Sequence, residues 1–219
     1  MPRALFEKNG TAVYISHLDM MRLFQRAFQR SKLPLTHTQG FNPRPSVSIA
    51  MPLSLGMESR CELLDFELEG EGASNEEIRD RLNRNLISGV RVLEVYDDGR
   101  KLKHLAYLRC VVTLEYDAGI PEGAEEMIQQ LFSREQVLME KKNRNGVTQQ
   151  NLVPMIRRLE LAQDSPRELS LHALVCCQNP TLNPMQMAAA IETYLPELKP
   201  DFVRCRREEI YDADHAIFR

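Results

Sequence analysis

The sequence predicts an α+β fold of two ferredoxin-like domains in tandem, each with the element order β-α-β-β-α-β and an antiparallel sheet. The hydrophobic period switches repeatedly between two residues, typical of strands, and 3.6 residues, typical of helices. The order of these switches is similar in the two halves, which a polar, basic stretch, DDGRKLKH, separates. We therefore predict domains at 1–98 and 99–219, the second with an insertion at about 143–162.

The first half supplies one full set of elements. Residues 4–16 read as a strand pair or as one long strand that an Asn-Gly turn signal interrupts. Apolar residues then recur at helical spacing up to about residue 31, behind the N-cap Ser16. A capping box formed by Ser74 and Glu77 starts a second helix. Alternating apolar residues predict further strands at 33–38, 47–50, 62–68 and 90–96.

The second half repeats this order. Alternating patterns predict strands at 105–116, 137–141, 169–175 and 203–211. A helical stripe at 121–132 and a helix from Asn183-Pro184 to about residue 194 complete the set. The extra segment 147–162 fits no core element beyond a short helical turn near 152–156.

The composition sets limits on the class of protein. The 219 residues are 43% hydrophobic, with 10 Gly and 12 Pro, which excludes a disordered or collagen-like chain. No apolar stretch approaches the roughly 18 residues of a membrane span, and the opening MPRALFEKNG lacks a signal-peptide core. We expect a cytoplasmic protein with no membrane partner. Five cysteines without a C-x-x-C spacing predict free thiols, no bound metal and no cofactor.

Charge is distributed unevenly along the chain. The first 60 residues hold eight Lys or Arg against three Asp or Glu, although the whole chain has a net charge of -3. Arg22, Arg26 and Arg30 recur every four residues, opposite the apolar stripe of their helix. Because arginine suits bidentate phosphate contacts, this pattern favours an anionic partner, and a solvated helix face is the alternative.

The motif Ser16-His17-Leu18-Asp19 has a structural and a chemical interpretation. Ser16 and Asp19 form a capping box. His17 then lies in the first turn, where the helix dipole favours a neutral imidazole that can act as a base or contact an anion. The two roles are compatible.

The segment 36–45, THTQGFNPRP, is predicted to be a rigid binding loop. Two prolines restrict the residues before them to extended geometry and so hold Arg44 in place. Phe41 offers a stacking face, while Gln39 and Asn42 offer hydrogen-bond donors and acceptors. This combination is typical of a site for a nucleotide or single-stranded RNA. The alternative is a tight crossover in which Phe41 is buried.

These motifs together resemble those of an uncharacterised bacterial family, the radical-SAM-linked or radical-SAM-associated proteins. The similarity covers about residues 3–70 through SHLD, R-x-x-x-R, G-F-N-P-x-P and P-L-x-x-G-x-E-S, and returns in R-R-x-x-I-Y at 206–211. The resemblance implies a radical-SAM enzyme as partner. Because this chain has no C-x-x-x-C-x-x-C motif, it would be the separate protein that works with that enzyme. The tandem order is also similar to that of CRISPR endoribonucleases and tRNA pseudouridine synthases.

We therefore expect an RNA-binding accessory module without independent activity, which presents tRNA or rRNA to a radical-SAM enzyme. The arginines of the helix would hold phosphates, and the loop would grip a base or ribose together with His17. Two alternatives stay open. One is a metal-independent ribonuclease or nucleotide-modifying enzyme with His17 and His37 as base and acid and Asp19 beside them. The other is a protein-interaction module that docks on the radical-SAM partner. The residues expected to bind nucleic acid are Arg22, Arg26, Arg30, Gln39, Phe41, Asn42 and Arg44.

Overall fold

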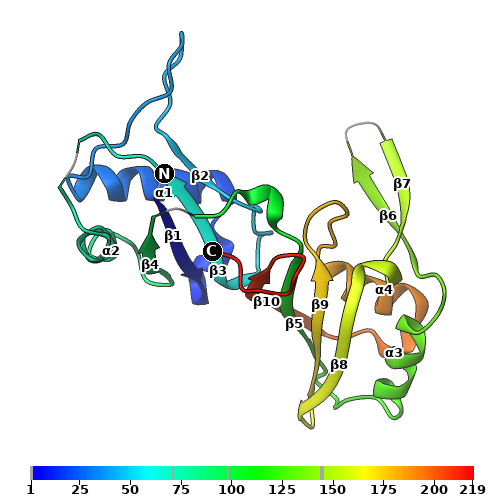
Figure 1. Cartoon of the computed structure of the whole chain (residues 1–219). Helices are drawn as coiled ribbons and strands as arrows, with labels where there is room; N and C mark the ends of the chain where they lie inside the picture. Colours follow the sequence, from blue (N-terminus) through cyan, green and yellow to red (C-terminus); the bar gives the residue numbers. More distant parts are fainter. Residues whose placement is uncertain (1, 71, 98, 144–145) are drawn as a thin grey trace. The chain divides into compact units, whose positions relative to one another are not determined.

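The structure is a computed structural model that describes residues 2–70, 72–97, 99–143 and 146–219 (Figure 1). Two compact units make up the chain. Unit 1 holds the residues up to Leu102 together with Arg219, and unit 2 holds Lys103–Phe218. Both units combine helices with antiparallel strands, so the α+β class predicted from the sequence is confirmed. No helix of the described residues is long and apolar enough to cross a membrane.

The described residues of unit 1 form four strands and two α-helices. Its sheet has the order β4-β1-β3, with β2 paired to the other edge of β3, and all of these pairs are antiparallel. In chain order the elements are β1 (Arg3–Lys8), the 3-10 helix η1 (Gly10–Tyr14), α1 (His17–Arg30), β2 (Val47–Ile49), β3 (Glu58–Phe66), α2 (Asn75–Asn83) and β4 (Val90–Tyr96).

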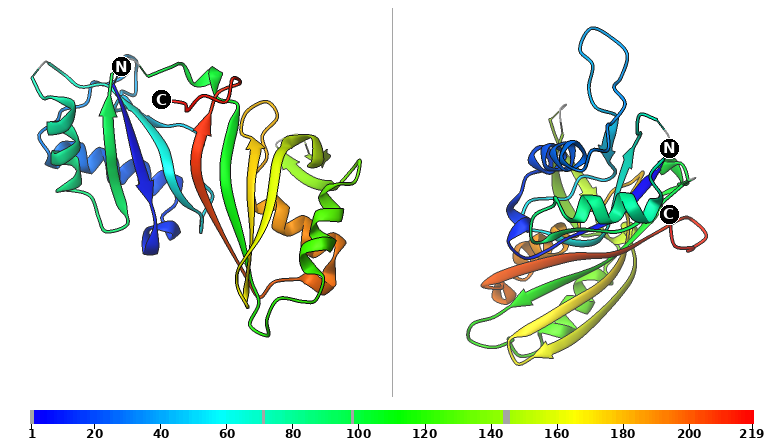
Figure 2. Two further views of the ribbon diagram at one scale, coloured as in Figure 1. Left: turned by 60° about the horizontal axis from the view of Figure 1, so that its bottom comes forward. Right: turned by 90° about the vertical axis from the view of Figure 1, so that its left-hand side faces the viewer.

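The core of unit 1 lies between its sheet and its two helices. The apolar stripe of α1 is buried, and Phe24 lies edge-on to Phe6 of β1 with the ring centroids 4.8 Å apart. Phe28 lies 4.9 Å from Phe66 of β3 by the same measure. Ile78 of α2 joins this cluster, so both helices cover the same face of the sheet (Figure 2). This packing fixes which side of α1 remains open to solvent.

Two predictions for unit 1 were wrong. After β1 the chain curls into η1 instead of continuing as a strand, because the Lys8 ammonium donates hydrogen bonds to the carbonyls of Val13, at 3.1 Å, and Ile15, at 2.8 Å. The predicted strand 33–38 is reduced to isolated bridges at Leu35 and His37. Pro34 has no N–H group, so this segment cannot donate a full ladder of hydrogen bonds.

In unit 2 the main strands follow the order β10-β5-β9-β8, and α3 and α4 lie on one face of them (Figure 2). The β6–β7 hairpin is a separate two-stranded sheet. Three further 3-10 helices are η2 (Leu102–His104), η3 (Val153–Met155) and η4 (Pro196–Leu198). The main elements are β5 (Tyr107–Glu115), α3 (Ala124–Phe132), β6 (Leu138–Asn143), β7 (Gly146–Asn151), β8 (Ile156–Ser165), β9 (Glu168–Cys176), α4 (Met185–Tyr194) and β10 (Phe202–Tyr211).

The second core strand of unit 2 is not the predicted one. The predicted strand 137–141 overlaps β6, which pairs only with β7 among the described strands. Its place next to β9 is taken by β8, which begins inside the segment 147–162 predicted to be extra material and continues to residue 165. β8 lies at the edge of the sheet and carries charged residues such as Arg157, Arg158 and Glu160, so its strand pattern in the sequence is weak. Residue 145, part of the predicted Asn-Gly turn, lies outside the described residues.

The five cysteines are free and buried, which confirms the prediction of free thiols. Burial raises the pKa of Cys177 to about 11 and that of Cys205 to about 12. Both therefore stay protonated at neutral pH and pack as small apolar side chains.

Candidate nucleic-acid site

A cavity of about 630 Å³ lies beside α1 in unit 1. Such a volume falls in the range of sites that bind small molecules or single nucleotide units. Its lining has three parts: the solvent side of α1, which we call the α1 wall; apolar side chains, which we call the floor; and a rim from the segment after the helix and from the residues that follow β3.

The α1 wall is polar and cationic. Arg22, Gln25, Arg26 and Gln29 line it, at spacings of three and four residues that place side chains on one helix face. Arg30 is exposed but does not line the cavity. Each step of four residues turns a helix by roughly 40° beyond a full turn, so the third arginine of the series has rotated away from the cavity.

The two arginines in the wall differ in their partners. Arg22 donates to the carboxylate of Asp19 at 2.9 Å, and both side chains are exposed. Arg26 forms no ion pair with any described residue. A surface pair of this kind contributes little to stability, so Arg22 can exchange Asp19 for another anion at small cost.

His37 and Glu69 stand together on the rim, with 3.9 Å between Nδ1 and the nearer carboxylate oxygen. A backbone bridge between Leu35 and Leu68 and a hydrogen bond of 2.8 Å from the Glu69 N–H to the Pro34 carbonyl bring these distant residues together. The cavity thus has cations from α1 and a carboxylate from the rim in its lining.

Buried apolar side chains form the floor. Phe28, Leu33 and Leu35 are nearly inaccessible, and Pro34 and Pro45 complete the surface. An apolar floor below polar walls suits a flat ring that carries polar groups at its edges.

Residues 36–46 form an irregular hairpin that rises from unit 1, drawn in blue above the helices in Figure 1. The Ser46 N–H donates to the Thr36 carbonyl at 2.7 Å, and the Thr38 N–H donates to the Arg44 carbonyl at 2.9 Å. His37 and Pro45 of the cavity pair at its base. The predicted rigid loop is therefore a hairpin with one end at the cavity.

The tip of the hairpin is fully exposed. The exposed fraction of Phe41 is 112%, the value of a completely solvated ring, so the alternative of a buried Phe41 is wrong. Gln39, Asn42 and Arg44 are also exposed, and none of them lines the cavity. A solvated aromatic ring at the end of a projecting hairpin is typical of a surface that stacks on a base or another ring.

The SHLD motif forms the predicted cap. Ser16 Oγ accepts a hydrogen bond of 3.2 Å from the Asp19 N–H and donates one of 2.7 Å to the Asp19 carboxylate. The hydrogen bond from Ser16, and then that from Arg22, lower the pKa of Asp19. This carboxylate is therefore ionised, and its two oxygens already accept hydrogen bonds from Ser16 and Arg22.

His17 does not meet His37 in the large cavity. It borders a separate space of about 10 Å³, together with the buried Lys8 and Glu62. This space is large enough for no more than about one water molecule. The structure thus brings His37 together with the arginines and leaves His17 next to the sheet. Among the described residues, no group of three or more His, Cys, Asp or Glu side chains could hold a metal ion.

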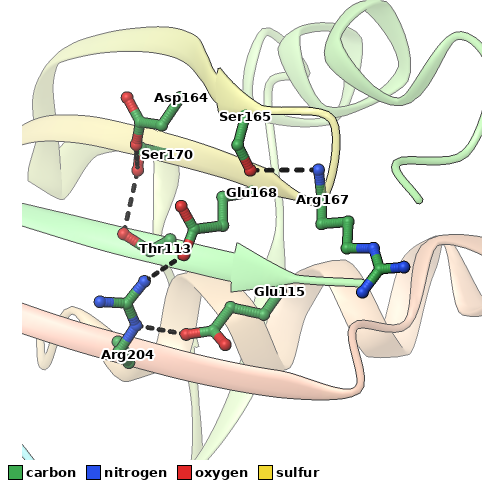
Figure 3. A network of polar contacts seen from close by, with 8 residues as sticks. All are labelled: Thr113, Glu115, Asp164, Ser165, Arg167, Glu168, Ser170 and Arg204. Atoms are coloured by element: carbon green, nitrogen blue, oxygen red, sulfur yellow. Dashed lines mark hydrogen bonds and ion pairs between the residues drawn. The ribbon is translucent and has the colours of Figure 1, made fainter. Parts of the chain in front are cut away.

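Unit 2 has a polar cluster of its own on the open face of its sheet (Figure 3). Arg204 of β10 pairs with Glu115 of β5 and, at 2.6 Å, with Glu168 of β9. Beside them the hydroxyls of Thr113 and Ser170 lie 2.9 Å apart. Carboxylates already surround this arginine, so the cluster stabilises the sheet and does not present a cation to an anionic ligand.

The sequence interpretation missed three polar residues of the cavity lining. Gln25 and Gln29 could have been found, because they share the helical spacing of Arg22 and Arg26. Glu69 could not, because backbone contacts between distant segments, the Leu35–Leu68 bridge and the hydrogen bond to the Pro34 carbonyl, bring it to the cavity.

Residues 2–184 match a family described as uncharacterized proteins conserved in bacteria, DUF2344. No curated protein matches the chain. The chain is similar to one in the crystal structure of a Cbf5-Nop10-Gar1 complex, with a TM-score of 0.50 and 9% identity over 95% of this chain and 48% of that one. It thus spans about half of that solved chain, and the similarity concerns the fold alone. A structure of an unknown protein from Galdieria sulphuraria, 9% identical over 94% of this chain and 96% of that one, has a TM-score of only 0.27.

Proposed function

The chain belongs to the DUF2344 family, and we propose that its unit 1 binds single-stranded RNA, such as a loop of tRNA or rRNA, and presents it to a radical-SAM enzyme. The observation that carries this proposal is the joint position of the arginine-lined cavity and the hairpin that ends in Phe41. Arginines supply phosphate contacts, and an exposed ring supplies a stacking face that any base can use.

The backbone arrangement supports a more detailed description of the fold. The sheet orders β4-β1-β3-β2 and β10-β5-β9-β8 are those expected of two ferredoxin-like domains, which we propose as the fold in detail. The radical-SAM partner rests on the resemblance of SHLD, G-F-N-P-x-P and the neighbouring motifs. In this proposal the chain selects and holds the RNA, and the partner performs the chemistry.

RNA binding is tested by the anisotropy of a fluorescent single-stranded oligoribonucleotide titrated with the full chain at several salt concentrations. We expect the logarithm of the affinity to fall with the logarithm of the salt concentration, with a slope of about -0.7 per phosphate contact. Arg26→Ala should weaken binding and make the slope shallower by about 0.7. Arg84→Ala is the matched control, because Arg84 is an exposed arginine of unit 1 that does not line the cavity.

An affinity independent of salt, or equal losses in Arg26→Ala and Arg84→Ala, would contradict the proposal. The partner is tested by co-expression with the radical-SAM enzyme. A complex that survives Arg22→Ala/Arg26→Ala leaves the cationic wall free for RNA. A complex that this double variant abolishes, in a chain that binds no RNA, would favour the protein-docking alternative.

A further inference from the structure

We infer that the 630 Å³ cavity holds one unstacked nucleotide of the bound strand and selects guanine, with Glu69 as the residue that determines this specificity. The inference rests on the proposed RNA-binding function and gives it a base preference. It follows from the opposite charges of the α1 wall and the rim, because a nucleotide has an anionic phosphate at one end and the polar edge of its base at the other.

The phosphate end belongs at α1. Arg26 has no ion pair with a described residue, and Arg22 is held only by the exposed Asp19. Both arginines offer paired N–H donors, whose geometry matches phosphate oxygens. The rim would repel a phosphate, because Glu69 stands there. Charge therefore favours a nucleotide whose phosphate lies at α1 and whose base lies at the rim.

The base belongs on the apolar floor. Phe28, Leu33 and Leu35 contribute apolar surface to the cavity, and Pro45 adds to it where the hairpin begins. A base that leaves its stack loses contacts with its neighbours, and such a surface replaces them without hydrogen bonds of its own. The floor thus binds any base and gives no base specificity.

Glu69 determines which base the cavity prefers. Its side chain is 59% exposed, and His37 Nδ1 lies 3.9 Å from its nearer carboxylate oxygen, beyond hydrogen-bond distance. Both carboxylate oxygens can therefore accept from a ligand. The Watson–Crick edge of guanine presents two adjacent donors, N1–H and N2–H, which match two carboxylate oxygens side by side. Adenine and cytosine present one amino group beside an acceptor nitrogen, and uracil presents one N–H between two carbonyls, so a carboxylate faces lone pairs with each of them.

The test uses the full chain and four fluorescent oligouridylates that differ at one central position: G, A, C or U. We expect the guanosine oligomer to bind about tenfold more tightly than the other three, as one bidentate contact with a base provides. Glu69→Gln should remove this preference, because an amide replaces one acceptor by a donor. Glu67→Gln is the matched control: Glu67 is an exposed carboxylate two residues away that bonds to Thr36 and lies outside the cavity lining, and this variant should keep the preference.

Equal affinities for the four oligomers, with binding that still falls with salt, would overturn the guanine inference and leave the proposed RNA binding intact. Absence of binding to all four would overturn both. A preference that survives Glu69→Gln would overturn the role of Glu69. A second arm adds free GMP as a competitor. Displacement of the guanosine oligomer by GMP at concentrations below the oligomer's own Kd would show that the cavity takes a free nucleotide, and would overturn the assignment to RNA.

Discussion

Arg3 on β1 and Asp65 on β3 form a bidentate ion pair, with Nε–Oδ1 and Nη2–Oδ2 distances of 2.5 Å and 3.1 Å. Arg3 is only 4% exposed and also donates to the Arg100 carbonyl at 2.9 Å. Burial by itself would lower the pKa of Arg3, but the hydrogen bond and the charge of Asp65 raise it above its ordinary value. The pair therefore ties the end of unit 1 to the middle of its sheet.

Arg3→Met should lower the free energy of unfolding by about 3 to 5 kcal/mol, because it leaves a largely buried carboxylate without its cation. Urea denaturation measures this loss. Arg79→Met removes an exposed ion pair with Asp80 and should leave the urea midpoint unchanged. Equal losses in the two variants would show that the buried pair contributes no more to the free energy of unfolding than the exposed one.

Ser16→Ala should lower the free energy of unfolding by about 1 kcal/mol, because it removes the N-cap of α1. Ser74→Ala removes the same type of cap from α2 and should cost about as much. Thermal or urea unfolding gives both values. If RNA affinity fell in Ser16→Ala at matched folding and not in Ser74→Ala, SHLD would have a binding role besides capping.

Phe41→Ala should weaken RNA binding by about 1 to 3 kcal/mol, the usual loss when a stacked base loses its ring. The melting temperature should stay unchanged, because the ring contacts no core residue, and the salt slope should stay unchanged because no phosphate contact is lost. Phe41→Tyr should retain the affinity. Tyr14→Ala, which removes another exposed ring of unit 1, serves as the control. Unchanged RNA affinity in Phe41→Ala would remove the hairpin tip from the site.

Stability should fall as the pH rises from about 9 to about 11. Burial raises the pKa of Cys177 from 9.0 to about 11, so in this window the unfolded chain releases a proton that the folded chain keeps. The thiol contributes its full stability below pH 9 and loses that contribution as the pH passes the folded value. Urea unfolding at successive pH values should show this decline, and Cys177→Ala should make it shallower. A variant curve with the same slope would assign the decline to other groups.

Local rules predicted the helices well and the edge strand poorly. α1 and α2 follow from their apolar spacing and serine caps, both of which lie within one short window of sequence. β8 escaped because an edge strand with Arg157, Arg158 and Glu160 reads as a polar linker, and only its pairing with β9 defines it. Distant pairing of this kind is absent from any local pattern.

The same limit applies to the site. Arg22 and Arg26 were predicted from helical spacing, and the structure places them together in the cavity wall. Arg30 was grouped with them because a spacing of four nearly preserves the helix face, but the drift moves it out of the lining. The position of Glu69 in the lining depends on a contact between residues more than thirty positions apart, Leu35 and Leu68. Neither the composition nor a motif of the sequence predicts this contact.

The hairpin 36–46 has a consequence for how such a chain can evolve. Because its tip buries nothing, substitutions at Gln39, Phe41 or Asn42 leave the packing of the unit unchanged. Mutations there do not lower the stability of the fold, whereas selection against loss of stability restricts changes at the buried Phe24 or Phe28. Descendants of one ancestral chain can therefore acquire new ligands by drift at a few solvated positions, while the scaffold that holds them is inherited unaltered.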